Sequence, residues 1–367
     1  MRIALDALGG DHAPQAVVAG AEAALERFSD LSIVLVGPPE AIEAAMSDVG
    51  KRHRDGGRLL IHAAAERIAV DEEPTRAVRQ KTDSSLVQMI YLVRDGAAEA
   101  AVSAGSTGAL LAAGLLCLGR LSGVLRPALA PIMPTTTGRG VLVLDVGATS
   151  DGKPEYIRQH AVLASRYAEA VLGWARPRVG LLNVGTEAAK GNALAKAAYT
   201  LLREAPVNFI GNIEARDVLF GAADIVVTDG FTGNVFLKAT EGAASAILSM
   251  LKDALQSGVR SKLGALLLMP ELKRLRLRLD YAAYGGTPLL GLTKPLIKAH
   301  GSSGPEAIAQ AITEARAYVE RGVGEALARE LSAFSTETKS PAMAGTAQDA
   351  ADGAAGESAE NHTEGER

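Results

Sequence analysis

The sequence predicts an α/β fold, a three-layer α/β/α sandwich with a largely parallel sheet. One unit recurs six times along the chain: a short apolar run, a turn rich in Gly, Asp or Asn, and then an apolar pattern with helical spacing. The composition agrees, because 48% of the residues are hydrophobic, 22% are charged and 4% are aromatic. Such values are typical of a globular enzyme with a large core.

The apolar runs and their turns alternate in a regular order. The runs cover 3–8, 100–104, 141–145, 179–183, 225–228 and 296–299, and the turns cover 9–14, 105–108, 146–149, 185–191, 229–234 and 300–305. Pro14 suits the first turn of the helix that follows it. In a parallel sheet, strand-to-helix turns lie at the edge where the carboxyl ends of the strands emerge. We therefore expect the polar turns to meet in one crevice.

The domain organisation follows from composition and charge. Residues 1–335 are predicted to form a single catalytic α/β domain, because no repeat and no Pro/Ser-rich linker divides them. Residues 336–367 hold seven acidic residues, two basic residues and no aromatic residue, so their net charge is −5 and that of 1–335 is +1. We expect a disordered acidic tail there, because such a segment buries too little apolar surface to fold.

Other global features exclude several classes of protein. The whole chain carries a net charge of −4 and no basic footprint, which argues against nucleic acid as a partner. Cys117 is the single cysteine, which excludes an intramolecular disulfide and favours the reducing cytoplasm. The first residues lack the pattern of a secretory signal. Residues 100–119 are uncharged but contain four glycines, so they favour a buried strand, a turn and a helix over a membrane span.

No metal site and no cofactor are predicted. The chain lacks a cysteine cluster and an H-E-x-x-H pattern. Four aspartates could coordinate Mg²⁺ if the fold brought their carboxylates together: Asp6, Asp11, Asp145 and Asp229.

The segment 257–281 departs from the α/β pattern and is predicted to project as an amphipathic hairpin. It joins six basic residues to an apolar tip at 263–269. Seven residues are too few to span a membrane, but apolar side chains beside basic ones suit an anionic membrane surface. The predicted membrane contacts are Leu263, Leu266, Leu267, Leu268 and Met269. The alternative is that these side chains form core or a dimer contact, with the basic residues facing solvent.

Two turns have the character of anion-binding loops. Gly105, Ser106, Thr107 and Gly108 precede a predicted helix, where unpaired amides and the helix dipole favour negative charge. The turn 300–304, His-Gly-Ser-Ser-Gly, repeats this arrangement before Pro305. Neither turn is a Walker loop, and no G-x-G-x-x-G follows a strand directly. A simple helix cap is the alternative for both.

Single residues in the turns offer acid–base or electrostatic chemistry. Asp11 and His12 follow the first strand, where a histidine exchanges protons at neutral pH or caps the next helix. Lys190 closes a loop of small residues, where an ammonium group would stabilise an oxyanion or a phosphate. Asn234 begins a helix and either caps it or faces a ligand.

A series of long motifs resembles the PlsX family, the bacterial phosphate acyltransferases of phospholipid synthesis. The resemblance covers nearly all of residues 1–330 and leaves out the acidic tail. The motifs are LDALGGDHAP (5–14), EEPTRAVRQKTDSSL (72–86), VSAGSTGAL (102–110), LDVGAT (144–149), NVGTEAAKG (183–191), GNIEARD (211–217), VVTDGFTGNVFLK (226–238), YGGTPLLGL (284–292) and HGSSG (300–304).

The resemblance implies a reaction and partners. A long-chain acyl-[acyl carrier protein] and inorganic phosphate would give acyl phosphate and free carrier protein, without a cofactor. The acyl phosphate would serve a membrane glycerol-3-phosphate acyltransferase in phosphatidic acid synthesis. The resemblance also implies a homodimer with a fold like that of phosphate acetyltransferases. Such an enzyme is cytoplasmic and associates peripherally with the membrane.

The expected mechanism is direct attack of phosphate on the thioester, with no acyl-enzyme. Lys190 and Asn234 match family motif positions and would stabilise the oxyanion, and His12 or His300 would orient phosphate or move a proton. Phosphate or substrate would be bound by Asp11, Gly105, Ser106, Thr107, Gly108, Asp145, Asn183, Asp229, Thr232, Gly233, His300, Ser302 and Ser303. Members of the family commonly have Asn at the positions of Ser106 and Thr149, which shifts the binding role towards backbone amides.

Acyl carrier proteins are acidic, so a basic docking patch is expected. The candidates are Lys273, Arg274, Arg276 and Arg278, which would attract anionic lipid equally well. Three rival functions remain at this point: a coenzyme A-dependent phosphate acetyl- or butyryltransferase, a decarboxylating hydroxy-acid dehydrogenase, and a non-catalytic membrane scaffold.

Overall fold

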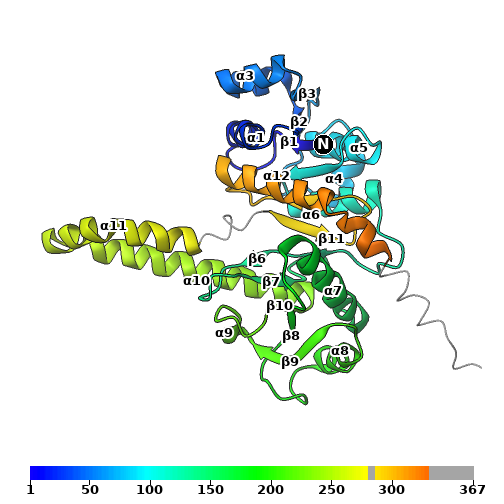
Figure 1. Ribbon diagram of the computed structural model, residues 1–367, viewed down its shortest axis with the longest axis vertical. Coiled ribbons are helices and arrows are strands. Elements are labelled where there is room, and N and C mark those ends of the chain that lie inside the picture. The colour runs from blue at the N-terminus through cyan, green and yellow to red at the C-terminus, as the bar shows by residue number, and fades with distance from the viewer. Residues whose placement is uncertain (280–285, 330–367) are drawn as a thin grey trace, which may run out of the picture.

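The computed structural model describes residues 1–279 and 286–329 and has the predicted α/β class with mostly parallel strands (Figure 1). Its strands are divided between two sheets, whereas the turn pattern predicts one. The predicted acidic tail, 336–367, lies outside the described residues, as do 280–285 at the end of the predicted hairpin. The consequence for the site is that two separate carboxyl edges carry the polar turns.

The first sheet has seven strands in the order β3-β2-β1-β4-β12-β11-β5. Neighbours from β3 to β12 run parallel, and β11 is antiparallel to both of its neighbours. The strands are β1 (Arg2–Asp6), β2 (Ser32–Gly37), β3 (Leu59–Ala63), β4 (Ala100–Ser103), β5 (Ala128–Leu129), β11 (Thr287–Leu290) and β12 (Leu296–Lys298).

Helices cover both faces of this sheet, because side chains along a strand alternate between its faces. Ile3 and Leu5 of β1 pack with α1 and α12, whereas Ala4 between them packs with α5. The helices around this sheet are α1 (Gln15–Arg27), α2 (Pro39–Ala45), α3 (Asp48–Asp55), α4 (Pro74–Gln80), α5 (Ser85–Arg94), α6 (Thr107–Ala113) and α12 (Pro305–Glu320). Helix α6 continues into a π-helical turn, η1 (Gly114–Leu118), so the run 100–119 folds as predicted.

The second sheet has five strands in the order β6-β7-β10-β8-β9, and β6 alone is antiparallel to its neighbour. The strands are β6 (Ile132–Met133), β7 (Val141–Leu144), β8 (Arg178–Asn183), β9 (Asn208–Glu214) and β10 (Ile225–Val227). One face packs on α7 (Pro154–Tyr167), its π-helical continuation η2 (Ala168–Leu172) and α8 (Ala193–Arg203). Helix α9 (Ala215–Val218) follows β9.

A shared apolar core joins the two sheets. Val141 and Val143 of β7 and Val226 of β10 belong to the same cluster of buried side chains as Ile90 of α5 and Leu110 of α6. A polar contact adds to this joint, because the hydroxyl of Tyr167 in α7 donates to a carboxyl oxygen of Glu314 in α12. Burial raises the pKa of Glu314 to about 8, so this carboxyl is protonated at neutral pH.

A long helical hairpin projects from the body of the protein (Figure 1). Helix α10 (Gly230–Gln256) forms the outgoing arm, and α11 (Val259–Leu279), which contains Pro270, returns beside it. The described part of the predicted excursion, 257–279, is the turn and α11, and α10 supplies the other arm. The apolar run 263–269, predicted as the tip, lies within α11. Leu266 and Leu267 are 68% and 74% exposed, and Leu263, Leu268 and Met269 are exposed as well.

No helix in the described part of the chain has the length and the apolar character needed to cross a membrane. Of the four predicted docking residues, Arg274 is exposed and lies 3.8 Å from Glu271. The side chains of Lys273, Arg276 and Arg278 lie outside the described part of the structure.

Candidate active site

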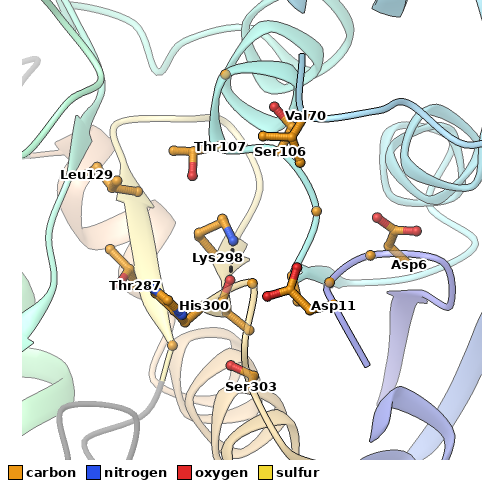
Figure 2. Close-up of a pocket in the computed structure, with 18 of the residues that line it drawn as sticks. Asp6, Asp11, Val70, Ser106, Thr107, Leu129, Thr287, Lys298, His300 and Ser303 are labelled. Atoms are coloured by element: carbon orange, nitrogen blue, oxygen red, sulfur yellow. Dashed lines mark hydrogen bonds between the residues drawn. The ribbon is translucent and has the colours of Figure 1, made fainter. Parts of the chain in front are cut away.

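A cleft of about 450 Å³ lies where the two sheets meet. One side is formed by the loops that follow β1, β4 and β12 of the first sheet, and the other by the loop after β7 and the first turns of α10. Figure 2 shows the side chains that converge there from the first sheet. The turns of three parallel strands therefore meet in one crevice, as expected for the carboxyl edge of a sheet.

Asp6 lies at the floor of this cleft and is buried. Its carboxylate accepts hydrogen bonds from the hydroxyls of Ser85 and Ser103, at 2.6 and 2.7 Å, and from the backbone N–H of Leu8. Burial nevertheless raises the pKa of Asp6. A Cβ on the nearby Gly9 would lie 2.7 Å from both the Asp6 Oδ2 and the backbone N of Gly105, so this close approach of two loops requires glycine.

The first predicted anion-binding loop lines the cleft with all four of its residues, Gly105, Ser106, Thr107 and Gly108. Ser103 connects it to the floor, because its hydroxyl donates to Asp6 and accepts from the N–H of Gly105 at 2.9 Å. The Ser106 hydroxyl is turned to the helix, where it accepts from the N–H of Ala109. The Ser106 side chain therefore caps α6 in this structure, which is the alternative that the sequence left open.

The second predicted loop contributes His300 and Ser303 to the cleft, together with Gly301. Ser302 is exposed, and its N–H donates to Nδ1 of His300 at 3.2 Å. Burial, together with the charges of Lys238 and Lys298, lowers the pKa of His300. Nδ1 also lies 2.8 Å from the hydroxyl of Ser302. In the neutral tautomer in which Nδ1 accepts both hydrogen bonds, the ring proton lies on Nε2.

The loop after β7 forms the opposite side of the cleft and depends on Asp145. This fully buried carboxylate accepts hydrogen bonds from four backbone N–H groups, those of Leu129, Gly147, Ala148 and Thr149. The side-chain amide of Asn234 donates to the carbonyl of Val146 in this loop at 2.9 Å. Asn234, Val146 and Gly147 line the cleft, whereas Asp145 and Gly233 lie behind it. A Cβ on Gly233 would overlap the carbonyl oxygen of Asp145, so these two segments pack in direct contact.

The remaining predicted residues lie outside the cleft. Asn183, Asp229 and Thr232 line a second cavity, of about 600 Å³, between β8, α8 and the other side of α10. Asp229 caps α10 there by accepting from the N–H of Thr232 at 2.9 Å. His12 and Lys190 are exposed, and neither lines the cleft. For Lys190 the physical reason is the second sheet, because the turn after β8 faces the second cavity, on the other side of α10. His12 follows Asp11 of the cleft but is itself exposed outside it.

Several charged residues of the cleft were missed by the sequence analysis. Arg67, Lys238, Glu241 and Lys298 line it together with Asp6 and Asp11. Lys238 pairs with Glu241 at 2.8 Å, and Arg67 donates to the carbonyl of Gly10. A signal for Lys298 was present in the sequence, because a lysine interrupts the apolar run 296–299 directly before the His300 turn. Within the described residues, no group of three or more His, Cys, Asp or Glu could hold a metal ion.

Comparisons with known proteins identify the family and the fold. A family described as "Fatty acid synthesis protein" matches residues 1–326. A phosphate acyltransferase from Bacillus cereus is 53% identical over 324 residues, which are 88% of this chain and 96% of the relative. A phosphate acyltransferase from Bacillus anthracis is 52% identical over 323 residues, with the same coverage. The chain belongs to the phosphate acyltransferase family. The predicted family and the predicted transferase class are thereby confirmed.

Solved structures confirm the predicted phosphate-acetyltransferase-like fold of this phosphate acyltransferase family member. A phosphotransacetylase from Streptococcus pyogenes has a TM-score of 0.55 and 18% identity, with 86% of this chain and 94% of that one covered. The EutD phosphotransacetylase from Staphylococcus aureus has a TM-score of 0.53 and 15% identity, with the same coverage. At these identities the likeness is one of fold alone.

Replacing Asp145 by alanine is expected to lower the free energy of unfolding by about 2–4 kcal/mol, because four backbone N–H groups lose a charged acceptor in a buried place. Equilibrium denaturation measures this change. The exposed Asp151, in the same loop region, is the matched control, and Asp151→Ala should change stability by less than about 0.5 kcal/mol. Equal effects of the two substitutions would contradict the positioning role of Asp145.

Proposed function

We propose that this chain transfers a long-chain fatty acyl group from an acyl-[acyl carrier protein] thioester to inorganic phosphate. The observation that carries the proposal is the cleft, where a loop of small residues, Gly105–Gly108, faces cationic side chains in a member of the phosphate acyltransferase family. Backbone amides, hydroxyls and ammonium groups are the chemistry that recognises phosphate. The product, acyl phosphate, would supply a membrane glycerol-3-phosphate acyltransferase in phosphatidic acid synthesis.

The proposed chemistry is a direct displacement. A phosphate oxygen attacks the thioester carbonyl carbon, a C–O bond forms, the C–S bond breaks, and the thiolate leaves with the carrier protein and takes up a proton. No cysteine lines the cleft. Cys117 lies elsewhere in the described chain, and burial raises the pKa of its thiol, which makes it a poor nucleophile. Both observations support a mechanism without a cysteine acyl-enzyme. The carbonyl oxygen becomes negative during attack and needs a hydrogen-bond donor.

The residues at the cleft divide into two groups by their chemistry. The Gly105–Gly108 loop and Ser303 would hold phosphate, and His300 would orient it through the proton on Nε2. Asn234 would stabilise the oxyanion, since one of its two amide hydrogens is used by the carbonyl of Val146 and the other remains available. Lys190 and His12 lie outside the cleft, so their proposed role is to act on the incoming thioester outside the phosphate site.

The projecting hairpin is the proposed membrane and carrier-protein surface. Its exposed apolar residues, Leu263 and Leu266–Met269, lie on α11 beside basic residues of the same helix. Apolar side chains with cationic neighbours suit an anionic membrane interface, and cationic side chains also suit an acidic carrier protein. We further propose that the enzyme is a homodimer in the cytoplasm and that it associates peripherally with the membrane.

A coenzyme A-dependent phosphate acetyl- or butyryltransferase is the second candidate, because the structural likeness is to phosphotransacetylases. The two functions share the attack on a thioester and differ in the thioester used. Substrate choice therefore decides between them.

The proposed reaction is tested by mixing the protein with palmitoyl-[acyl carrier protein] and inorganic phosphate. We expect phosphate-dependent release of the carrier thiol and an acyl phosphate that hydroxylamine traps as a hydroxamate. Reactions without phosphate, and reactions with acetyl-coenzyme A, are the controls. Faster turnover of acetyl-coenzyme A would favour the second candidate. If phosphate caused no release of thiol from either thioester, both candidate functions would be wrong.

Asn234→Ala is expected to lower kcat by about 10²- to 10³-fold, which is the effect of removing one oxyanion donor. Lys190→Ala should have a smaller effect on kcat and act mainly on the KM for the thioester, because Lys190 is exposed outside the cleft. Steady-state kinetics on folded variants separates the two parameters. Near-normal kcat for Asn234→Ala would remove this residue from the mechanism.

The double substitution Leu266→Glu/Leu267→Glu should reduce sedimentation of the protein with anionic liposomes by at least about tenfold, since two largely exposed apolar side chains become charged. Turnover of soluble substrates should stay within about twofold. Phe220, which is 69% exposed after α9, gives the matched control Phe220→Glu, which should bind liposomes normally. Equal liposome binding by all three proteins would contradict the membrane role of the hairpin.

A further inference from the structure

Lys298 is a buried lysine whose side chain enters the cleft. It is the last residue of β12, it is 8% exposed, and the two residues before it in the strand, Leu296 and Ile297, are fully covered. Figure 2 shows its side chain between the loop that carries Thr107 and the loop that carries Asp11. Lysine is seldom buried without a partner, because removal of an ammonium group from water is costly. The position therefore needs a physical explanation.

The hydrogen bonds of Lys298 leave part of its ammonium group unused. Its Nζ donates to the carbonyl oxygen of the adjacent Ala299, which is its one hydrogen-bond acceptor among the described residues. An ammonium group has three N–H donors, so two remain for another acceptor. Asp6 is close enough to act on it electrostatically but already accepts from Ser85, Ser103 and Leu8, and Lys298 forms no ion pair with it in the described structure.

The charges around Lys298 point to an anion as the missing acceptor. Asp6 and Asp11, at the end of β1 and in the loop after it, act to raise the pKa of Lys298, whereas burial and Lys238 of α10 lower it, and the result is about 8. Glu241 of α10 forms an ion pair with Lys238, and Arg67 donates a hydrogen bond to the carbonyl of Gly10. The lowered pKa of His300 keeps its ring neutral at pH 7. No side chain in the described cleft satisfies Lys298 directly, so a bound anion would compensate its burial.

We propose that Lys298 is a catalytic residue that binds the phosphate substrate, with its ammonium group donating to a phosphate oxygen opposite the Gly105–Gly108 loop. The inference rests on the proposed function. The ligand class is inorganic phosphate or the phosphate group of the acyl phosphate product. The positive charge also screens the incoming dianion from Asp6 and Asp11, which would otherwise repel it.

This role has a pH dependence with a definite sign. Below about pH 8, Lys298 is an ammonium group and attracts phosphate; above that value, the free enzyme loses the proton and with it the attraction. The KM for phosphate should therefore rise with pH above about 8, approaching tenfold per pH unit if binding requires the charged form. The KM for the thioester should show no such rise above about pH 8.

The decisive variants are Lys298→Met, which keeps the length without the charge, and Lys298→Arg, which keeps the charge at all accessible pH values. Lys294 is the matched control, because it is exposed in the turn before the same strand. Lys298→Met should weaken binding of inorganic phosphate, measured by calorimetry, by about 10- to 100-fold, as for loss of a charged hydrogen bond. It should raise the KM for phosphate similarly and leave that for the thioester within about twofold. Lys294→Met should match the unsubstituted protein.

Lys298→Arg supplies a test that holds even if Lys298→Met fails to fold. The rise of the KM for phosphate above about pH 8 should disappear in this variant. Unchanged phosphate affinity in folded Lys298→Met, or an unchanged pH profile in Lys298→Arg, would overturn the inference. Phosphate binding without acyl phosphate formation would contradict the proposed function alone, whereas acyl phosphate formation by Lys298→Met with a normal KM for phosphate would contradict this inference alone.

Discussion

A continuous layer of buried aliphatic side chains, shared by α5, α6, β7 and β10, holds the two sheets against each other. Every feature of the cleft depends on this layer, because the loops of the first sheet and the start of α10 belong to different sheets and meet only where the sheets pack. Protein interiors are close-packed, so such a joint has little freedom to shift. The position of the cleft is therefore set by the packing of the two sheets against each other.

Two buried aspartates perform matching tasks on opposite sides of the cleft. Asp6 ends β1 and accepts from two serine hydroxyls and one backbone amide, while Asp145 follows β7 and accepts from four backbone amides. In each case a carboxylate satisfies donors that a tight loop would otherwise leave buried and unpaired. The loops can therefore approach their neighbours closely, as Gly9 approaches Gly105 and Gly233 approaches Asp145.

Local charge in the cleft matters more than the net charge of −4. Arg67, Lys238 and Lys298 come from three elements distant in sequence and meet Asp6, Asp11 and Glu241 in one small volume. Lys238 pairs with Glu241, whereas the buried ammonium group of Lys298 donates only to the carbonyl oxygen of Ala299 among the described residues. This arrangement is the basis of the proposal that the cleft binds phosphate as the acyl acceptor.

The sequence by itself determined the α/β class, the family and the loops rich in Gly and Ser, because apolar periodicity and turn chemistry are local properties of the chain. It also located Gly105–Gly108, Asn234 and His300, which line the cleft. Only the tertiary structure decided that the strands form two sheets, that His12 and Lys190 lie outside the cleft, and that Lys298 enters it from inside a strand. The reason is that the choice of strand neighbours, and the direction in which an edge faces, depend on packing between residues far apart in sequence, which no local pattern records.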